Sequence, residues 1–288
     1  MTTHEPHALK ELDRPAESEH ARAVSALRSL SPDAGRSAIA EQLVSFVAPD
    51  SFVADQYRAL RHNIELLRKE SGLHLFAVTS PGPGDGKTIT TLNLAGALAQ
   101  NFDARVLVID ADLRRPKVAD YLGLGSQHSP GLVDLIRDSS CDLDRVVRRL
   151  DGFNLMVLPA GVAQVSPYEL LNSPRVEALL TEARRRYDWV IVDTPPIVAV
   201  PDGRLIGRWV DGFLIIIGAH RTPRKLVAEA LDLVDPGKVI GIVFNGDDRP
   251  LSGRYGYYSH YYTSNAHRSS WWRRALKLDR RASRRSSR

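Results

Sequence analysis

Three short stretches of this sequence combine residue types suited to binding phosphate and a metal ion. In the first, Ser80-Pro-Gly-Pro-Gly-Asp-Gly-Lys-Thr88, three glycines lead to Lys87 and Thr88. An apolar run, Leu73 to Val78, precedes this stretch, and a helix-like run, Ile89 to Gln100, follows it. This order of strand, glycine loop, Lys-Thr and helix is typical of a P-loop. We therefore expect Lys87 to reach the β- and γ-phosphates of a nucleotide and the Thr88 hydroxyl to hold Mg²⁺.

The loop between strand and helix is expected to bind phosphate mainly through its backbone. Gly82, Gly84 and Gly86, with Asp85 among them, let the chain curl so that N–H groups point at phosphate oxygens. The positive end of the following helix adds to this attraction. The loop departs from the strict G-x-x-x-x-G-K-[ST] template, because Pro81 stands at the first glycine position. The alternative is a glycine turn that binds nothing.

The second stretch, Val106-Leu-Val-Ile-Asp-Ala-Asp112, places Asp110 and Asp112 at the carboxyl end of an apolar run. Ligands of doubly wound sheets bind beside that edge, and residues two apart point to the same side of a strand. One aspartate could serve the Mg²⁺ shell while the other accepts a proton from an attacking hydroxyl. We assign the proton to Asp110 and the metal to Asp112, and leave the reverse open. The alternative is a solvated pair at a strand end.

The third stretch, Trp189-Val-Ile-Val-Asp-Thr-Pro-Pro196, ends another apolar run in Asp193. A carboxylate at the end of a hydrophobic strand is the usual Mg²⁺ carboxylate of nucleotide-binding folds. The two prolines end the strand, because proline cannot donate to a sheet ladder. Asp202 is a weaker candidate, and its alternative role is to cap the next helix.

The elements that must position these residues alternate between apolar runs and helical patterns. Such alternation predicts an α/β protein with a doubly wound, mostly parallel sheet flanked by helices, which for these motifs is a P-loop NTPase fold. We expect strands at Leu73–Thr79, Arg105–Asp110, Asn154–Pro159, Trp189–Asp193, Gly212–Ile217 and Val239–Asn245. We expect helices at Lys87–Gln100, Arg115–Tyr121, Gly131–Arg137, Pro174–Tyr187, Gly203–Trp209 and Thr222–Val234. A further amphipathic helix at 51–70 precedes the first strand, with Asp50-Ser51 to cap it and Gly72 to end it.

Composition and charge divide the 288 residues into three parts. Residues 1–50 form a largely disordered segment by composition, 51–247 form the folded domain, and 248–288 form a flexible tail. Residues 249–288 hold eleven Lys and Arg against one Asp, a net charge of +10, whereas the whole chain carries +5. The basic tail favours an anionic partner such as a lipid surface, nucleic acid or an acidic protein. A single cysteine excludes an internal disulfide and suits a reducing compartment.

These motifs resemble those of the bacterial tyrosine kinases of capsule and exopolysaccharide synthesis. The likeness runs from about residue 50 to a tyrosine cluster in the tail, and its most specific feature is that cluster. The cluster consists of Tyr255, Tyr257, Tyr258, Tyr261 and Tyr262. The resemblance implies an enzyme that uses ATP and Mg²⁺ and phosphorylates these tyrosines between neighbouring subunits. It also adds Ile89 and Asn245 to the expected nucleotide site.

The resemblance further implies assembly and a membrane partner. Asp55, Arg58 and Arg61 resemble the Glu-x-x-Arg-x-x-Arg oligomerisation motif of the family, with Asp in place of Glu, and share one helix face. We expect a homo-oligomer, in ring form for the family. The sequence has no signal-peptide core and no apolar run long enough to span a bilayer. A cytoplasmic location is therefore expected, at the inner face of the membrane, through a separate transmembrane polysaccharide co-polymerase.

Other readings of the tail and of the whole protein remain open. The tyrosine cluster could be a low-complexity segment that stacks on RNA or partners, although no specific nucleic acid is expected. The basic segment near Trp271-Trp272 could rest on an anionic membrane surface or be an unstructured end. The alternative functions are a partition-type positioning ATPase and a non-catalytic ATP-binding adaptor of a polysaccharide export complex. The positioning ATPases usually carry a lysine where this loop has Gly82, which argues against the first alternative.

Overall fold

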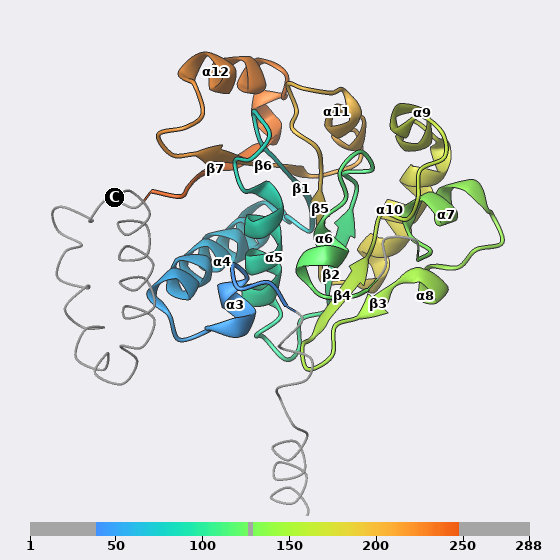
Figure 1. Ribbon diagram of the computed structural model, residues 1–288, viewed down its shortest axis with the longest axis horizontal. Helices are drawn as coiled ribbons and strands as arrows, with labels where there is room; N and C mark the ends of the chain where they lie inside the picture. The colour runs from blue at the N-terminus through green and yellow to red at the C-terminus, as the bar shows by residue number, and fades with distance from the viewer. Residues whose placement is uncertain (1–38, 126–128, 248–288) are drawn as a thin grey trace, which may run out of the picture.

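The structure is a computed structural model that describes residues 39–125 and 129–247, and in this part of the chain seven strands form one sheet (Figure 1). The strands are β1 (Leu75–Thr79), β2 (Val106–Asp110), β3 (Arg148–Arg149), β4 (Leu155–Leu158), β5 (Trp189–Asp193), β6 (Gly212–Gly218) and β7 (Val239–Asn245). Their order across the sheet is β3-β4-β2-β5-β1-β6-β7. Neighbouring strands run parallel except β3, which pairs antiparallel with β4. The predicted doubly wound, mostly parallel α/β fold is confirmed.

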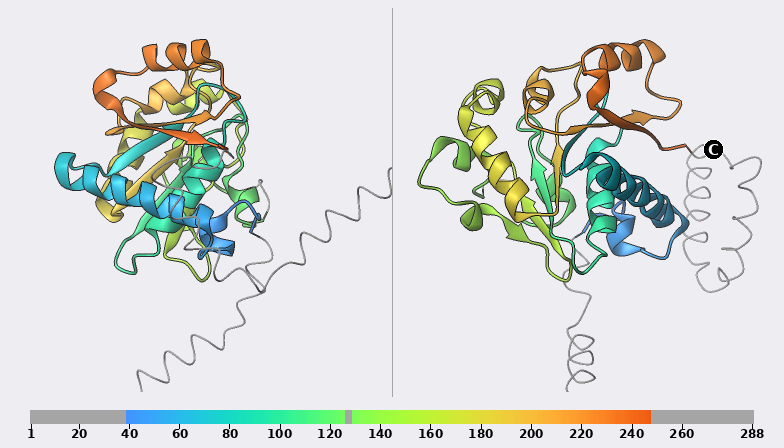
Figure 2. Two further views of the ribbon diagram at one scale, coloured as in Figure 1. Left: turned by 90° about the vertical axis from the view of Figure 1, so that its left-hand side faces the viewer. Right: turned by 180° about the vertical axis from the view of Figure 1, so that it is seen from behind.

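Helices cover both faces of this sheet. On each face, a cluster of buried apolar side chains lies between the sheet and the helices. On one face, α3, α4, α5 and α6 pack; on the other, α7 to α12 pack (Figure 2). The helices of the first face are α3 (Val44–Val47), α4 (Phe52–Ser71), α5 (Lys87–Leu98) and α6 (Val118–Tyr121). Those of the second are α7 (Leu132–Arg137), α8 (Leu143–Val146), α9 (Pro167–Leu171), α10 (Pro174–Arg186), α11 (Asp202–Ile206) and α12 (Arg224–Asp232), and a 3-10 turn, η1 (Pro236–Lys238), precedes β7.

The central strands are apolar throughout because helices cover both of their faces. In β1, Phe76 and Val78 enter the cluster under α4 and α5, while Leu75 and Ala77 enter the opposite cluster. This is the period of two that a strand imposes. A fully buried side chain of this size contributes roughly 1.5–3 kcal/mol to folding, so the middle strands hold the sheet rigidly under the site.

The long amphipathic helix before the first strand forms as the sequence predicts. It is α4, and the Ser51 hydroxyl caps it by accepting from the Ala54 N–H at 3.2 Å. Gly72 ends it in the left-handed region at φ 71°. Its buried face, which includes Ile64, packs on α5.

The chain before α4 differs from the prediction in residues 39–50. Leu43 and Phe46 are fully buried, and the Phe46 ring meets the Phe153 ring edge-on at 4.9 Å between centroids. The Ser45 N–H donates to the Asn93 side chain at 2.9 Å. Residues 39–50 are therefore part of the folded unit. An average over the Ala- and Ser-rich composition of 1–50 hid this short apolar cluster, and residues 1–38 lie outside the described part.

Other differences are small. The edge strand β3 and the helices α3, α8 and α9 were not predicted, because each spans at most five residues and gives no periodic signal. The helix predicted at Arg115–Tyr121 begins at Val118 instead, because Pro116 and the capture of its first N–H groups by Asp110 delay its start. No helix in the described ranges is long and apolar enough to cross a bilayer.

Candidate active site

The carboxyl ends of three neighbouring strands carry the predicted chemistry. In the sheet, β1 lies beside β5, and β5 lies beside β2. The register pairs Asp110 with Asp193, and Val78 with Asp193. Residues from sequence positions about a hundred apart therefore reach one edge of the sheet, which is where doubly wound sheets bind ligands.

The glycine loop between β1 and α5 has the backbone geometry of a phosphate-binding turn. Gly84 and Gly86 have φ angles of 84° and 92°, values that favour glycine. At Gly86 a Cβ atom would also lie 2.0 Å from the Asn245 side-chain nitrogen, so a side chain there would displace Asn245. The first turn of α5 has no side-chain cap and no acidic residue. Its N–H groups and positive end therefore remain available to an anion.

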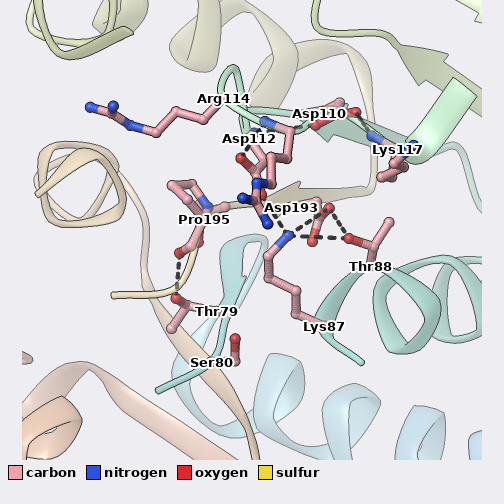
Figure 3. A network of polar contacts seen from close by, with 12 residues as sticks. Thr79, Ser80, Lys87, Thr88, Asp110, Asp112, Arg114, Lys117, Asp193 and Pro195 are labelled. Carbon is pink, nitrogen blue, oxygen red and sulfur yellow. Dashed lines mark hydrogen bonds and ion pairs between the residues drawn. The ribbon is translucent and has the colours of Figure 1, made fainter. Parts of the chain in front are cut away.

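The Lys87 ammonium group lies at the centre of the site (Figure 3). Its Nζ atom is 2.9 Å from an Asp112 oxygen and 3.6 Å from an Asp193 oxygen. The Thr88 hydroxyl donates to the same Asp193 oxygen at 2.7 Å. Four predicted residues, Lys87, Thr88, Asp112 and Asp193, are thus brought together by three strand ends and one helix start.

Burial and charge set the pKa values of this group in opposite directions. Burial by itself lowers the pKa of Lys87, but the negative charges of Asp193 and Asp112 outweigh it, and the net pKa is raised. Burial raises the pKa of Asp193, against the effects of Lys87 and of the Thr88 hydrogen bond. Lys87 therefore stays positive and balances carboxylates that are otherwise costly to bury.

Asp110 lies at the same edge but has a different environment. It is 1% exposed, and its carboxylate accepts the backbone N–H groups of Asp112, Lys117 and Val118 at 3.2, 3.1 and 3.1 Å. It thus shapes the loop after β2 that carries Asp112. Burial, followed by the charge of Asp193, raises the pKa of Asp110 to about 8. One side of Asp110 lines a small hollow of about 10 Å³ beside Pro116 and Gly161.

An ion pair that the sequence did not reveal joins two of the loops at this edge. The Arg114 guanidinium donates to both carboxylate oxygens of Asp202, at 2.7 and 3.1 Å. Asp202 begins α11 and is fully buried. The candidate cap is therefore the partner of an arginine two residues after Asp112. The Asp-x-Asp-x-Arg spacing was a signal in the sequence, but nothing there connected it to Asp202.

Side-chain oxygens that could bind Mg²⁺ lie close together here, but they are too few to form a complete metal site without another ligand. Mg²⁺ prefers oxygen donors and keeps several waters. The Thr88 hydroxyl and the Asp193 and Asp112 carboxylates supply such donors within one site. Across the described ranges, no three His, Cys, Asp or Glu side chains group so as to hold a metal by themselves. The donor set fits a metal that is shared with nucleotide phosphates.

The remaining predicted residues have mixed placements. Gly82 donates its N–H to the Asp85 carboxylate at 3.1 Å, and the Asn245 side chain donates to the Asp85 carbonyl at 2.9 Å. Asn245, at the end of β7, thus adjoins the glycine loop, and its contact with nucleotide stays a prediction. Ile89, in the first turn of α5, packs at the edge of the buried cluster. The tyrosine cluster at 255–262 lies outside the described residues.

The predicted oligomerisation residues lie on α4, away from the strand ends that form the site. Arg58 pairs with Asp55 and also donates to the Pro49 carbonyl. The Arg61 guanidinium donates to Glu65 and to the Ala97 carbonyl, both at 2.8 Å. These partners belong to the same chain. The contact with another subunit stays a prediction.

The fold and the glycine loop define a protein of the P-loop NTPase class, and comparisons with known proteins refine this. Residues 75–202 match a family model described as an AAA domain. The chain is 34% identical over 218 residues to the tyrosine-protein kinase YwqD of Bacillus subtilis. This match covers 75% of this chain and 90% of that protein. It is 32% identical over 223 residues to the putative tyrosine-protein kinase EpsB of Ralstonia nicotianae, of which it spans 29%.

A solved structure agrees with these relatives. The kinase domain of the Escherichia coli tyrosine kinase ETK superposes with a TM-score of 0.67 at 30% identity, covering 75% of this chain and 84% of that one. This chain belongs to the bacterial tyrosine-protein kinase family.

Proposed function

We propose that this protein is an ATP-dependent protein-tyrosine kinase that phosphorylates the tyrosines of its own C-terminal segment between subunits. The observation that carries the proposal is the convergence of Lys87, Thr88, Asp112 and Asp193 on one point at the end of the P-loop. Phosphoryl transfer depends mainly on positioning and on neutralising charge, and this group supplies both. Membership of the family agrees with the same activity.

Each residue has a role that its contacts support. The glycine loop and Lys87 bind the β- and γ-phosphates, because the loop offers N–H groups and Lys87 a buried positive charge. The Thr88 hydroxyl would hold Mg²⁺, and Asp112 and Asp193 would support its shell. Mg²⁺, when bound, neutralises the charge of the phosphate oxygens. Asn245 and Ile89 complete the nucleotide site beside the loop.

Asp110 is our candidate for accepting the proton of the tyrosine hydroxyl. A pKa near 8 makes its carboxylate a stronger base than an ordinary aspartate. Asp110 also lines a small hollow of about 10 Å³. Asp112 is the other candidate, because its carboxylate faces Lys87 while Asp110 accepts three backbone N–H groups. Separate substitution of the two aspartates distinguishes the roles, as argued below.

The acceptors we propose are Tyr255, Tyr257, Tyr258, Tyr261 and Tyr262 of a neighbouring subunit. Assembly would use the α4 face that carries Asp55, Arg58 and Arg61. We also propose that the kinase acts in exopolysaccharide or capsule synthesis, at the inner face of the membrane. A transmembrane co-polymerase would recruit it there, and the basic tail would add contact with anionic lipid. These points rest on the family and on the sequence, with residues 39–247 as the kinase unit.

Phosphotyrosine analysis of the purified protein tests the proposal. Incubation with Mg-ATP should place phosphate on the tail tyrosines, as mapped by mass spectrometry. Lys87→Met should abolish it, whereas the exposed α12 change Lys225→Met should not. ATP hydrolysis without phosphotyrosine would instead indicate a positioning ATPase. Nucleotide binding without turnover, in the presence of the membrane activator, would indicate an adaptor.

A further inference from the structure

A second loop, between β6 and α12, holds the glycine loop from the side opposite to the strand ends of β2 and β5. The Thr222 hydroxyl donates to one carboxylate oxygen of Asp85 at 2.6 Å. The other oxygen of the same carboxylate accepts the Gly82 N–H at 3.1 Å. Asp85 is 5% exposed, so its charge is satisfied by protein groups. Thr222 is therefore connected to the start of the glycine loop through a single carboxylate.

A neighbouring side chain makes a second, independent contact with the glycine loop. The Arg221 guanidinium donates to the Gly84 carbonyl at 2.7 Å. This carbonyl directly precedes Asp85 in the chain. Two consecutive residues of one loop thus fix two consecutive residues of the other, one through a side chain and one through the backbone.

The β6–α12 loop is itself shaped to present these two residues. The backbone N–H groups of Arg221 and Thr222 both donate to the Gly218 carbonyl, at 3.1 and 3.0 Å. The Thr222 hydroxyl in turn accepts the Gly218 N–H at 3.0 Å. His220, between them, has a φ of 59°, a left-handed value that costs energy for a residue with a side chain. Three hydrogen bonds to Gly218 stabilise this strained turn.

The two loops also approach closely, so that a side chain at either glycine would have to displace its neighbours. A Cβ atom on Gly218 would lie 2.9 Å from an Asp85 carboxylate oxygen and 3.1 Å from the Arg221 guanidinium. A Cβ atom on Gly82 would lie 3.1 Å from a Leu226 methyl group of α12. The glycine loop is therefore packed against α12 and the β6–α12 loop, and it is hydrogen-bonded to that loop.

We propose that Thr222 and Arg221 are positioning residues for nucleotide phosphates. By fixing Asp85 and Gly84, they keep the glycine loop in its phosphate-binding shape before the nucleotide arrives. Binding to a preformed loop avoids the entropic cost of ordering it at that moment. The inference deepens the proposed function and rests on it only so far as this site binds nucleotide.

The contacts of Thr222 and Arg221 lead to one kinetic expectation. Both act on the loop backbone through Asp85 and Gly84, rather than on Lys87, Thr88 or the aspartates. They should therefore affect how tightly phosphates bind more than how fast the phosphoryl group is transferred. The free energy of a hydrogen bond to a buried carboxylate is large enough that its loss should weaken nucleotide binding about tenfold.

Direct nucleotide binding to the full chain, measured with a fluorescent ATP analogue and with ADP, tests the proposal. Thr222→Val keeps the shape of the side chain and removes the hydroxyl. We expect it to raise the Kd of both nucleotides and the KM for ATP about tenfold, with kcat at saturating ATP reduced less than about twofold. Thr222→Ser keeps the hydroxyl and should restore binding to within about twofold of wild type. Thr181→Val, an exposed change on α10, serves as the matched control.

The outcomes separate this inference from the proposed function. A wild-type protein that binds no nucleotide would refute both. A wild-type protein that binds nucleotide, together with Thr222→Val at wild-type Kd or Thr222→Ser without recovery, would refute the positioning role alone. A merely structural role would lower Tm and leave the Kd of the folded protein unchanged. If Thr222→Val does not fold, Arg221→Ala decides: an increase in Kd of about threefold or more supports the role, and wild-type affinity overturns it.

Discussion

The Thr88 hydroxyl donates a 2.7 Å hydrogen bond to the Asp193 carboxylate across 105 positions of sequence. Thr88 lies in the first turn of α5, the helix after β1, and Asp193 ends β5. Because β1 and β5 are neighbours, the parallel sheet alone brings these two residues within reach. The contact places the two proposed Mg²⁺ oxygens side by side, and Lys87 lies beside both.

Removing the Thr88 hydroxyl should affect Mg²⁺-dependent catalysis more than it affects folding. We expect Thr88→Val to reduce kcat about 100-fold and to raise the Mg²⁺ concentration needed for half-maximal rate, because a direct metal ligand is lost. Thr88→Ser should retain most activity. Initial rates of phosphotyrosine formation across a Mg²⁺ series measure this. Equal Mg²⁺ dependence in Thr88→Val and wild type would contradict the assignment of this hydroxyl to the metal.

Asparagine substitutions at Asp110 and Asp112 should separate the base from the metal support. If Asp110 accepts the tyrosine proton, Asp110→Asn lowers kcat by about 100-fold or more, leaves ATP affinity close to wild type and removes the alkaline rise of the rate near pH 8. Asp112→Asn should instead raise the Mg²⁺ concentration needed for half-maximal rate and keep that rise with pH. The pH profiles of both variants at saturating ATP provide the measurement. The exchanged pattern would assign the proton to Asp112.

The buried state of Asp110 also predicts how stability depends on pH. Its pKa is raised from an ordinary 3.8 to about 8, so the folded protein holds a proton that the unfolded chain loses above about pH 4. The free energy of unfolding should therefore fall as pH rises from about 4 to about 8. In Asp110→Asn this fall between pH 5 and pH 8 should be smaller, by roughly 3–4 kcal/mol. Urea unfolding in the presence of a chelator measures both slopes.

A control for this slope is available at Asp138, whose pKa is lowered by hydrogen bonds from Ser140. The stability linked to a lowered pKa is gained by about pH 4, so Asp138→Asn should not alter the change between pH 5 and pH 8. If Asp110→Asn keeps the wild-type slope, Asp110 is ionised in the folded protein.

The ion pair between Arg114 and Asp202 should stabilise the site more than a surface pair of similar geometry. Asp202 is fully buried, so Arg114→Ala leaves a charge without its partner and should cost about 2–4 kcal/mol of unfolding free energy. Arg105 is 60% exposed and also pairs with an aspartate, Asp188. Arg105→Ala should cost clearly less, because solvent screens an exposed pair. Chemical denaturation of the two variants compares these values directly, and equal costs would show that burial of Asp202 is unimportant.

The sequence predicted the fold and the site where a local pattern carries the information. The strands at Trp189–Asp193 and Val239–Asn245 were predicted with their observed bounds, because apolar runs end sharply at prolines or polar residues. The glycine loop and Lys87 were predicted from a motif between an apolar run and a helical run, and the three aspartates from their places at the ends of apolar runs. Their convergence follows from the rule that parallel strands present their carboxyl ends to one edge.

The features that sequence could not predict depend on contacts between distant segments. Nothing near Asp202 indicates that Arg114 will reach it, and nothing near Thr222 indicates that it will hold Asp85. The same limit applies to Phe46, whose burial depends on Phe153 over a hundred residues away. In each case the order of strands in the sheet decides which distant residues meet. The residue pattern around each position does not specify that order.

The charge of the C-terminal segment predicts that phosphorylation changes its attraction to anionic surfaces. Residues 249–288 carry eleven Lys and Arg and one Asp, a net of +10, and five tyrosines lie among them. Each phosphate adds roughly −1.5 to −2 charges, so three remove about half of the positive charge and five come close to cancelling it. Since each basic residue near an anionic membrane contributes about 1 kcal/mol, phosphorylated protein should bind such vesicles at least tenfold more weakly.

Co-sedimentation with vesicles that contain phosphatidylserine measures this effect, before and after incubation with Mg-ATP. Neutral vesicles and a higher salt concentration should both reduce binding of the unphosphorylated protein, because the attraction is electrostatic and is screened by ions. Lys87→Met carries the same tail charge without phosphorylation and should keep its affinity in the presence of Mg-ATP. Mass spectrometry should first show three or more phosphates per tail. If the affinity for vesicles is then unchanged, phosphorylation of the tail tyrosines does not control membrane binding. Their modification would then have to act through the encounter between subunits.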